Sequence, residues 1–246
     1  MYLHRRNSMS NNKHLPNSVP AFAVQKHVTT TEGESKWVTL TEKDLFEGKN
    51  VVIFGLPGAF TPTCSTQQLP GYEEAYQGFR DLGIDDIYCF TVNDTFVTQE
   101  WAQSLGIVNV KVIPDGSAEF TVKMNMDVRK DNLGFGLRSW RYAALVESGR
   151  ISLEFVEEGF GDNIGDDPYI ISNPYNVMEA VKQYHIDSTD EDGNEKFVGQ
   201  PTDEDVSAQL EAERLDALNS DDEVDNEGQH IELDFSETTD VKEKFS

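Results

Sequence analysis

Two cysteines, Cys64 and Cys89, are the only thiols among the 246 residues, and they lie in different settings. Cys64 ends the run Val51-Val-Ile-Phe-Gly-Leu-Pro-Gly-Ala-Phe-Thr-Pro-Thr-Cys64, in which an apolar strand is followed by a loop and a predicted helix start. The unpaired amides of a first helical turn carry positive partial charge and stabilise a thiolate. A thiolate there would be a nucleophile, whereas a single cysteine more commonly packs as a small apolar side chain. Spacing alone gives the two interpretations equal weight.

The loop before Cys64 contains residues suited to holding a small substrate. Pro57 and Pro62 stiffen the loop and remove backbone donors, while Gly58 lets a small molecule approach the backbone closely. Thr61 lies three residues before Cys64, so its hydroxyl could donate to the sulfur and accept from a bound OH group.

A cation near the sulfur would favour the nucleophile, and two arginines are candidates. Both lie in Leu137-Arg-Ser-Trp-Arg-Tyr-Ala-Ala-Leu-Val-Glu147. Arg141 stands where an apolar strand begins, and a charge there is costly unless it has a partner. We therefore prefer Arg141 to Arg138. Cys89 lies in the middle of Ile87-Tyr-Cys-Phe-Thr-Val92, which predicts a packed core residue.

Short β-branched or aromatic runs alternate with helical patterns from residue 19 to residue 185, which predicts one α/β domain with a central sheet. Ser148-Gly149 separates the last two of its strands and predicts an antiparallel hairpin. The predicted strands are residues 36–39, 50–55, 86–92, 109–113, 141–147 and 151–156, and the predicted helices are 64–78, 95–105, 118–124 and 176–184.

The two ends of the chain differ in composition from this domain. Residues 1–18 are polar and lack periodicity, which predicts a flexible leader. Residues 186–246 hold 21 acidic and 4 basic residues, and we predict an acidic, largely disordered tail with a possible amphipathic helix at 201–219. A partial calcium-loop pattern at 188–199 lacks carboxylates at both of its end positions, so calcium binding is not predicted.

Charge and composition exclude several classes of function. A net charge of −25 disfavours nucleic acid and anionic membranes as partners, and no apolar run is long enough to span a bilayer. The five histidines are scattered, so we predict neither a metal nor a bound cofactor. Two cysteines are too few for a disulfide scaffold, which favours a reducing compartment, and we predict a cytoplasmic location.

The motif around Cys64 resembles a known family. Pro57-Gly-Ala-Phe-Thr-Pro-Thr-Cys-Ser65 is similar to the PxxxTxxC motif of peroxiredoxins. With Leu69-Pro-Gly-Tyr72 and Thr91-Val-Asn-Asp-Thr-Phe-Val97, residues 19–185 resemble the atypical type II (Prx5) subfamily. The resemblance implies a thioredoxin-like fold, in which helices flank a central mixed β-sheet.

The same resemblance implies the chemistry. Cys64 would be the peroxidatic cysteine, Thr61 would hold the peroxide, Pro57 would shield the thiolate and Arg141 would activate it. Hydrogen peroxide and organic hydroperoxides would be reduced to water and alcohols through a sulfenic acid on Cys64.

Resemblance also implies a homodimer that forms through the face around the active-site loop, with Phe60, Phe96 and Tyr142 in the contact.

The sequence departs from the family where a second thiol would return Cys64 to its resting state. Members that form an internal disulfide carry a resolving cysteine late in the domain, and residues 157–164 here contain none. We therefore predict recycling by an external thiol, with glutathione and glutaredoxin favoured over thioredoxin. The competing hypothesis is a redox sensor whose acidic tail engages a partner, but Thr61 and Arg141 would be superfluous in a passive scaffold.

Overall fold

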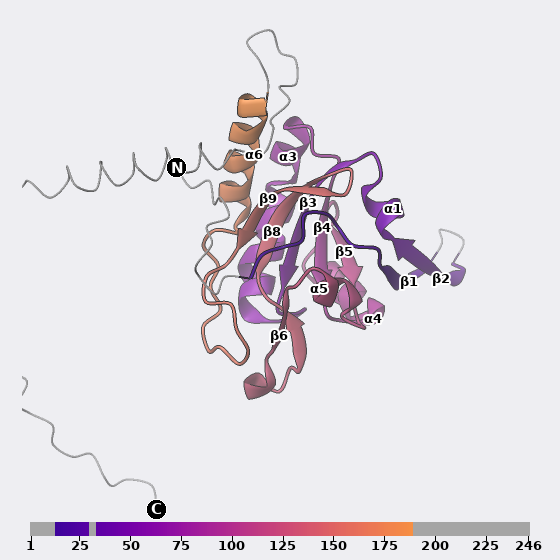
Figure 1. The fold of residues 1–246 in the computed structure, drawn as a ribbon. Coiled ribbons are helices and arrows are strands. Elements are labelled where there is room, and N and C mark those ends of the chain that lie inside the picture. The colour runs from indigo at the N-terminus through magenta and orange to yellow at the C-terminus, as the bar shows by residue number, and fades with distance from the viewer. Residues whose placement is uncertain (1–12, 30–32, 189–246) are drawn as a thin grey trace, which may run out of the picture. The chain divides into compact units, whose positions relative to one another are not determined.

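A five-stranded mixed sheet forms the centre of the computed structural model, which describes residues 13–29 and 33–188 (Figure 1). The spatial order is β5-β4-β3-β8-β9, in which β3 runs parallel to β4 and antiparallel to β8. The strands are β3 (Asn50–Leu56), β4 (Asp86–Thr91), β5 (Lys111–Pro114), β8 (Tyr142–Glu147) and β9 (Arg150–Val156).

Strand β3 is central because both of its faces are covered. Every residue from Val51 to Leu56 is buried, which explains why the sequence here is a continuous apolar run without alternation. Val52 and Phe54 join the core on one side of the sheet, and Val51 and Ile53 join the core on the other.

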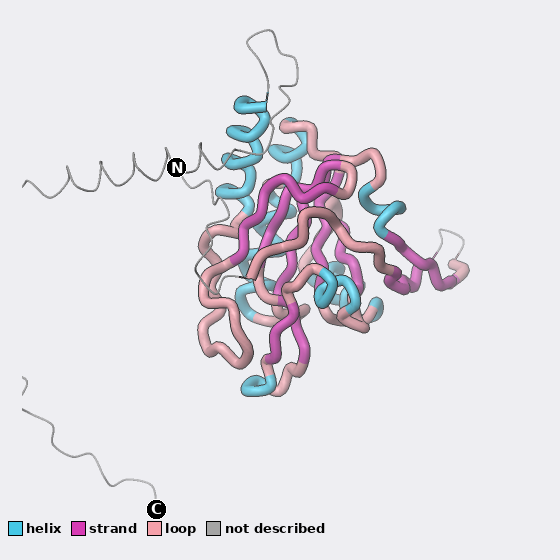
Figure 2. Tube along the Cα trace, in the orientation of Figure 1, coloured by secondary structure: helices cyan, strands magenta, loops and turns pink. Residues whose placement is uncertain are grey.

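Helices cover both faces of the sheet (Figure 2). Stacking of Phe54 on Tyr72, with ring centroids 4.0 Å apart, ties the central strand to the helix that follows it. The α-helices are α1 (Glu42–Phe46), α2 (Leu69–Glu74), α3 (Tyr76–Asp81), α4 (Thr95–Ser104), α5 (Glu119–Lys123) and α6 (Pro174–Ser188).

Two small antiparallel sheets accompany the central sheet. One pairs β1 (Ala23–Thr29) with β2 (Ser35–Thr41), and the other pairs β6 (Asp127–Arg129) with β7 (Leu137–Ser139). The first extends the predicted strand at 36–39, whereas β1, β6 and β7 were not predicted because they are short or edge strands with weak patterns.

The predicted hairpin at the end of the sheet is confirmed. Strands β8 and β9 pair antiparallel, and Ser148 and Gly149 both adopt positive φ in the turn, at 46° and 86°. A two-residue turn with positive φ at both positions matches the twist of the strands it joins.

The predicted helix at 64–78 is wrong in its continuity. Its first part is a π-helical turn, η1 (Cys64–Gln68), and Ala75 separates α2 from α3, which ends at Asp81. The wide turn forms because the amide of Leu69 donates to the carbonyl of Cys64, five residues earlier.

The described structure extends beyond both predicted ends of the domain. Leu15 is buried, and its amide donates to Glu154 at 2.9 Å, so the residues from 13 to 18 that were assigned to a leader pack on the domain. Helix α6 continues to Ser188. The predicted helix at 201–219, the partial calcium-loop pattern and nearly all of the predicted tail lie outside the described residues.

Aromatic residues lie both in the core and at the surface, and one prediction about them needs correction. Trp101 and Trp140 are core residues, whereas Trp37 on β2 is 58% exposed. Tyr142 is buried against Gly55 inside the domain, so it does not belong to a subunit contact. Sequence pattern alone cannot tell a core aromatic from one that lies on an edge strand.

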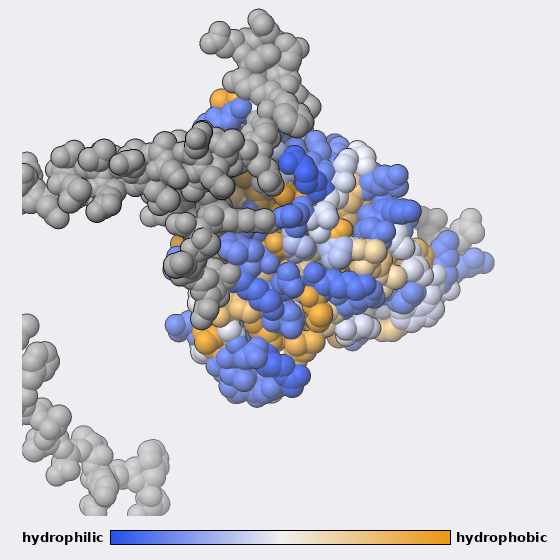
Figure 3. Space-filling model, in the orientation of Figure 1, coloured by the Kyte–Doolittle hydropathy of each residue, from blue (hydrophilic) through white to orange (hydrophobic). Residues whose placement is uncertain are grey.

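On the face shown in Figure 3, hydrophilic residues alternate with small groups of hydrophobic ones. None of the helices in residues 13–29 and 33–188 has the length and apolar character needed to cross a membrane.

Gly55→Ala tests the packing of the central strand. A Cβ at this position would overlap Cε1 of Tyr142 and lie 2.7 Å from Oγ of Ser139, both in the packed interior. We expect the free energy of unfolding to fall by about 2 kcal/mol. Gly165→Ala is the control, because open space surrounds that position, and it should change stability by less than about 0.5 kcal/mol. Equal urea midpoints for the two variants would contradict the packing.

Candidate active site

Cys64 lies where the loop after β3 enters the helix. Helical backbone begins at Pro62, and the amide of Ser65 donates to the carbonyl of Thr61 at 3.0 Å, so Cys64 falls in the first turn as predicted. Its side chain is fully buried. The indole of Trp101 donates to Oγ of Ser65 at 3.0 Å, which anchors this turn to α4.

Arg141 reaches the sulfur from the neighbouring strand. Tyr142, the first residue of β8, pairs with Gly55 of β3, so Arg141 lies beside the end of β3 from which the loop to Cys64 departs. Its Nη1 is 3.5 Å from Sγ of Cys64, and only 1% of its side chain is exposed. The structure thus brings together the arginine and cysteine that the sequence analysis paired.

The guanidinium of Arg141 has two further partners. Its Nη2 lies 2.5 Å from Oδ2 of Asp167, and its Nη1 also donates to Oε1 of Gln68. Burial alone would lower the pKa of Arg141, but the negative charges of Cys64 and Asp167 outweigh burial and raise that pKa above its usual value. Arg141 is therefore a permanent cation at the sulfur.

The loop that carries Pro57 and Thr61 is fixed by hydrogen bonds. Thr61 Oγ1 donates to the carbonyl of Gly58 at 2.8 Å, and Oδ1 of Asn93 accepts from the amide of Ala59 at 2.9 Å. Pro57 is buried at the end of β3, and Thr61 is partly exposed. Both residues lie on the short segment between the central strand and Cys64, as their positions in the sequence predicted.

Arg138, the alternative cation, has a different position. Its Nη1 donates to the carbonyl of Val92 at 3.2 Å and to Oδ1 of Asn93 at 3.3 Å, and its Nε donates to the carbonyl of Phe135. A Cβ on Gly58 would lie 2.8 Å from this Nη1, so Arg138 packs tightly behind the loop. Partial burial lowers the pKa of Arg138.

The irregular loop after β9, residues 157–173, supplies contacts that the sequence analysis missed. Asp167 pairs with Arg141, and the ring of Tyr169 lies 5.5 Å from Cζ of the same guanidinium. Buried Glu157 holds the loop in place, because its Oε1 accepts from the amides of Ile170 at 2.8 Å and Ser172 at 2.9 Å. A loop without periodicity gives no sequence signal for such contacts.

Cys89 lies in the interior of the sheet, as predicted. It is fully buried on β4 and belongs to the same apolar core as Cys64. Burial raises the pKa of Cys89 well above its usual value, and the negative charge of Cys64 raises it further. The two cysteines therefore differ in the one property that makes a thiol reactive, a nearby cation.

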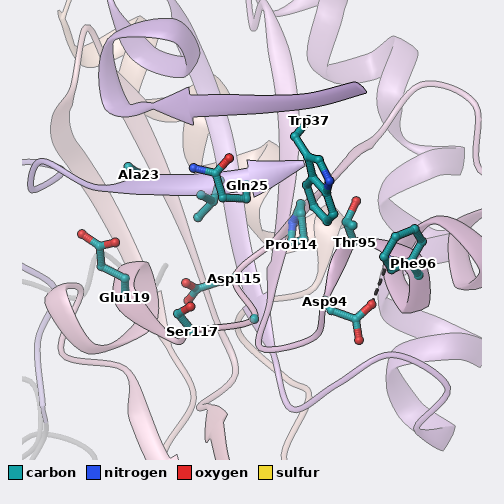
Figure 4. A pocket seen from close by; sticks show the side chains of 12 residues that line it. Ala23, Gln25, Trp37, Asp94, Thr95, Phe96, Pro114, Asp115, Ser117 and Glu119 are labelled. Carbon is teal, nitrogen blue, oxygen red and sulfur yellow. Dashed lines mark hydrogen bonds between the residues drawn. The ribbon is translucent and has the colours of Figure 1, made fainter. Parts of the chain in front are cut away.

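A cavity in the described part of the chain lies away from these residues (Figure 4). It has a volume of about 210 Å³ and lies between β1 and β2 on one side and the start of α4 on the other, with Trp37 and Gln25 above Thr95. Asp94 and Asp115 face it, but each already accepts backbone hydrogen bonds that cap a helix. Neither Cys64 nor Arg141 lines it.

Within residues 13–29 and 33–188, no group of three or more His, Cys, Asp or Glu side chains is arranged to hold a metal ion.

Comparison with known proteins identifies the family. The Redoxin family model matches residues 15–163, and a peroxiredoxin of Rhizobium etli is 58% identical over 147 residues, which are 60% of this chain and 82% of the relative. The chain is a peroxiredoxin. A hybrid peroxiredoxin, hyPrx5, of Haemophilus influenzae is 44% identical over 156 residues, which are 63% of each chain.

Solved structures agree with this assignment. The Plasmodium falciparum antioxidant protein, described as a 1-Cys peroxiredoxin, is 39% identical, covers 68% of this chain and 99% of its own, and has a TM-score of 0.65. The predicted thioredoxin-like fold and the resemblance to the Prx5 type are thus confirmed, and the protein is a thiol-dependent peroxidase.

Alkylation tests the difference between the two thiols of this peroxiredoxin. Because the pKa of Cys89 is raised, that thiol stays protonated at neutral pH, and iodoacetamide should label only Cys64 in the folded protein. Mass spectrometry after a short exposure checks this. Cys64→Ser should abolish the label and Cys89→Ser should keep it, so a label on residue 89 of the folded chain would contradict the assignment.

The two arginines can be separated by matched substitutions. Arg141→Lys removes the fork that reaches Cys64 and Asp167 together, and we expect kcat/KM for hydrogen peroxide to fall about 100-fold. Arg138→Lys changes hydrogen bonds to the carbonyl of Val92 and to Asn93 but leaves the contact between Arg141 and Cys64, and it should cost less than about fivefold. A larger loss in the Arg138 variant would reverse the choice between them.

Proposed function

We propose that Cys64 is the peroxidatic nucleophile of this peroxidase and that Arg141, Thr61 and Pro57 complete its active site. One observation carries the proposal: a buried guanidinium nitrogen lies 3.5 Å from the buried sulfur. A buried cation needs an anionic partner, and a thiolate beside it supplies one.

In the proposed reaction, the positive charge of Arg141 acts first on the thiolate and then on the departing oxygen. The thiolate of Cys64 attacks the terminal oxygen of a hydroperoxide, so that an S–O bond forms as the O–O bond breaks. Negative charge moves onto the departing oxygen, where Arg141 stabilises it more strongly than it stabilises the neutral substrate. The departing oxygen takes a proton from water, which leaves Cys64 sulfenic acid and water or an alcohol.

Thr61 and Pro57 have supporting roles in this proposal. The hydroxyl of Thr61 has one hydrogen, now donated to the carbonyl of Gly58, and its lone pairs remain able to accept from the OH end of a peroxide. Pro57 adds no backbone donor and keeps the end of β3 apolar, which limits hydration of the thiolate. Both hydrogen peroxide and organic hydroperoxides present the same reacting group to this site.

Recycling by an external thiol follows from the position of the second cysteine. Cys89 lies fully buried on an inner strand between β3 and β5, and burial raises its pKa, so its protonated thiol is a poor nucleophile toward an oxidised Cys64. A small thiol reaches a buried sulfenic acid more readily than a cysteine fixed on a protein surface does. We therefore favour glutathione over thioredoxin, with glutaredoxin removing the glutathione.

In the proposed cycle, two thiol-exchange steps return Cys64 to its resting state. Glutathione attacks the sulfur of the sulfenic acid, which releases water and forms a mixed disulfide on Cys64. A second thiol, supplied by glutaredoxin or glutathione, then attacks the glutathione sulfur and releases Cys64 as a thiolate.

We further propose that two copies associate through the face around the active-site loop. Phe60 and Phe96 are more than half exposed there in the single chain. Exposed aromatic side chains of this kind are typical of a surface that another protein covers. Both cysteines are free thiols, which fits action in the reducing cytoplasm.

Turnover with different reductants tests the proposal. Peroxide consumption by the full chain should be sustained by glutathione with glutaredoxin at least about tenfold faster than by thioredoxin with its reductase. Cys64→Ser should lower it to the background rate, while Cys89→Ser should keep more than about half. Mass spectrometry of the oxidised chain with glutathione should find the mixed disulfide on residue 64. An inactive Cys89→Ser variant would overturn the proposed roles.

A further inference from the structure

Arg141 is shared by two acidic groups. Its Nη1 lies 3.5 Å from Sγ of Cys64, and its Nη2 lies 2.5 Å from Oδ2 of Asp167. The terminal nitrogens of a guanidinium belong to one rigid plane, so the carboxylate and the sulfur are held close enough for their charges to interact. Burial alone would lower the pKa of Arg141, but the charges of Cys64 and Asp167 raise it, so both act on the same cation.

The charges of these three groups do not cancel when Cys64 is a thiolate. One guanidinium, one thiolate and one carboxylate leave a single negative charge. The thiolate alone would compensate the buried guanidinium, so the carboxylate of Asp167 is an additional charge at the reacting centre. Its side chain is 39% exposed on the loop after β9, whereas the side chain of Arg141 is 1% exposed.

The other titratable groups of the surrounding segments do not remove this charge. Arg138, behind the loop before Cys64, and buried Glu157, on the loop after β9, have opposite signs. Tyr169 and Cys89 also face these groups, but burial raises the pKa of each, so both are neutral at neutral pH. A peroxide that reaches the sulfur therefore meets an excess of negative charge.

From this arrangement we infer that Asp167 is a specificity-determining residue of the peroxidase, whose carboxylate repels negatively charged oxidants and favours neutral hydroperoxides. This inference rests on the proposed function of Cys64 and Arg141, and it names the substrate class of that site. Discrimination by an unfavourable interaction with the wrong substrate is a common source of specificity.

The physical reason lies in when the charge of the substrate arrives. A neutral hydroperoxide adds no charge on binding, and breaking its O–O bond only moves the charge of the thiolate onto the departing oxygen, beside Arg141. An oxidant that is already an anion brings a second negative charge before the reaction begins. Asp167 opposes that approach, because two like charges at short distance repel each other in a partly buried site.

Two hydroperoxides that differ in charge provide the measurement. β-Hydroperoxyisovalerate carries a carboxylate near its peroxide group, and its methyl ester has the same reacting group without the charge. With either compound the thiolate forms an S–O bond to the terminal oxygen as the O–O bond breaks, and the other oxygen takes a proton from water and leaves as an alcohol. Mass spectrometry of quenched samples of the full chain, without reductant, gives the second-order rate of Cys64 oxidation by each compound.

Asp167→Asn tests the inference, because it removes the charge and keeps an oxygen that can accept from Nη2 of Arg141. We expect the ratio of the acid rate to the ester rate to rise about 3- to 10-fold, an effect that solvent limits because the side chain is partly exposed. Asp167→Glu keeps the charge, and its ratio should stay within about twofold of the parent chain. Equal changes in both rates for Asp167→Asn, which altered structure alone would produce, would overturn the inference.

Asp166→Asn is the matched control. It removes the same charge from the neighbouring exposed residue of the same loop, whereas Arg141 pairs with Asp167. The ratio should then change by less than about 1.5-fold. A rise as large as that in Asp167→Asn would overturn the inference, since the overall charge of the chain would then select the substrate. If the parent chain reacts with neither hydroperoxide, the proposed function of Cys64 fails instead.

Discussion

A buried guanidinium charge that needs anionic partners determines much of this structure. Arg141 is almost completely removed from water, and a buried ion without partners is strongly unfavourable. In the proposed site, Cys64 as a thiolate and partly exposed Asp167 as a carboxylate provide the compensation. The requirement for an anion thus acts in both directions, since the cation favours the thiolate and the thiolate permits the cation.

The remaining architecture holds these three groups together. Pairing of β3 with β8 brings Arg141 to the end of the strand from which the loop to Cys64 departs. Asp167 is held less directly, because its loop depends on buried Glu157 and on the hydroxyl of Tyr72, which donates to the carbonyl of Ser172 at 2.7 Å. Helix, strand and loop each contribute one of the three groups, and no single element contains them all.

The sequence could predict those parts of the site that lie close together along the chain. Thr61 and Cys64 are three residues apart, so strand, loop and helix signals were enough to place them. Arg141 was predicted because a charge at the start of an apolar strand needs a partner. Gln68 gave no signal, since a glutamine within a helix is ordinarily solvent-exposed, and Asp167 was hidden in an acidic loop without periodicity.

The same distinction holds for the fold. Long apolar strands such as β3 were predicted within a residue or two, because burial on both faces leaves a clear pattern. The break at Ala75 was missed, since residues on both sides of it keep a helical pattern. Packing of Leu15 was missed as well, because one apolar residue among polar neighbours shows its partner only in three dimensions.

The contrast between the two cysteines shows that burial alone does not set their chemistry. Both are fully buried in the same apolar core, yet burial keeps Cys89 protonated whereas Arg141 stands beside Cys64. Backbone hydrogen bonds to the strands on both sides hold Cys89 within the sheet. In the proposed cycle, reduction of an oxidised Cys64 therefore comes from an external thiol. Asp167, partly exposed and bonded to Arg141, shows that the surroundings of the guanidinium meet the surface at the loop after β9.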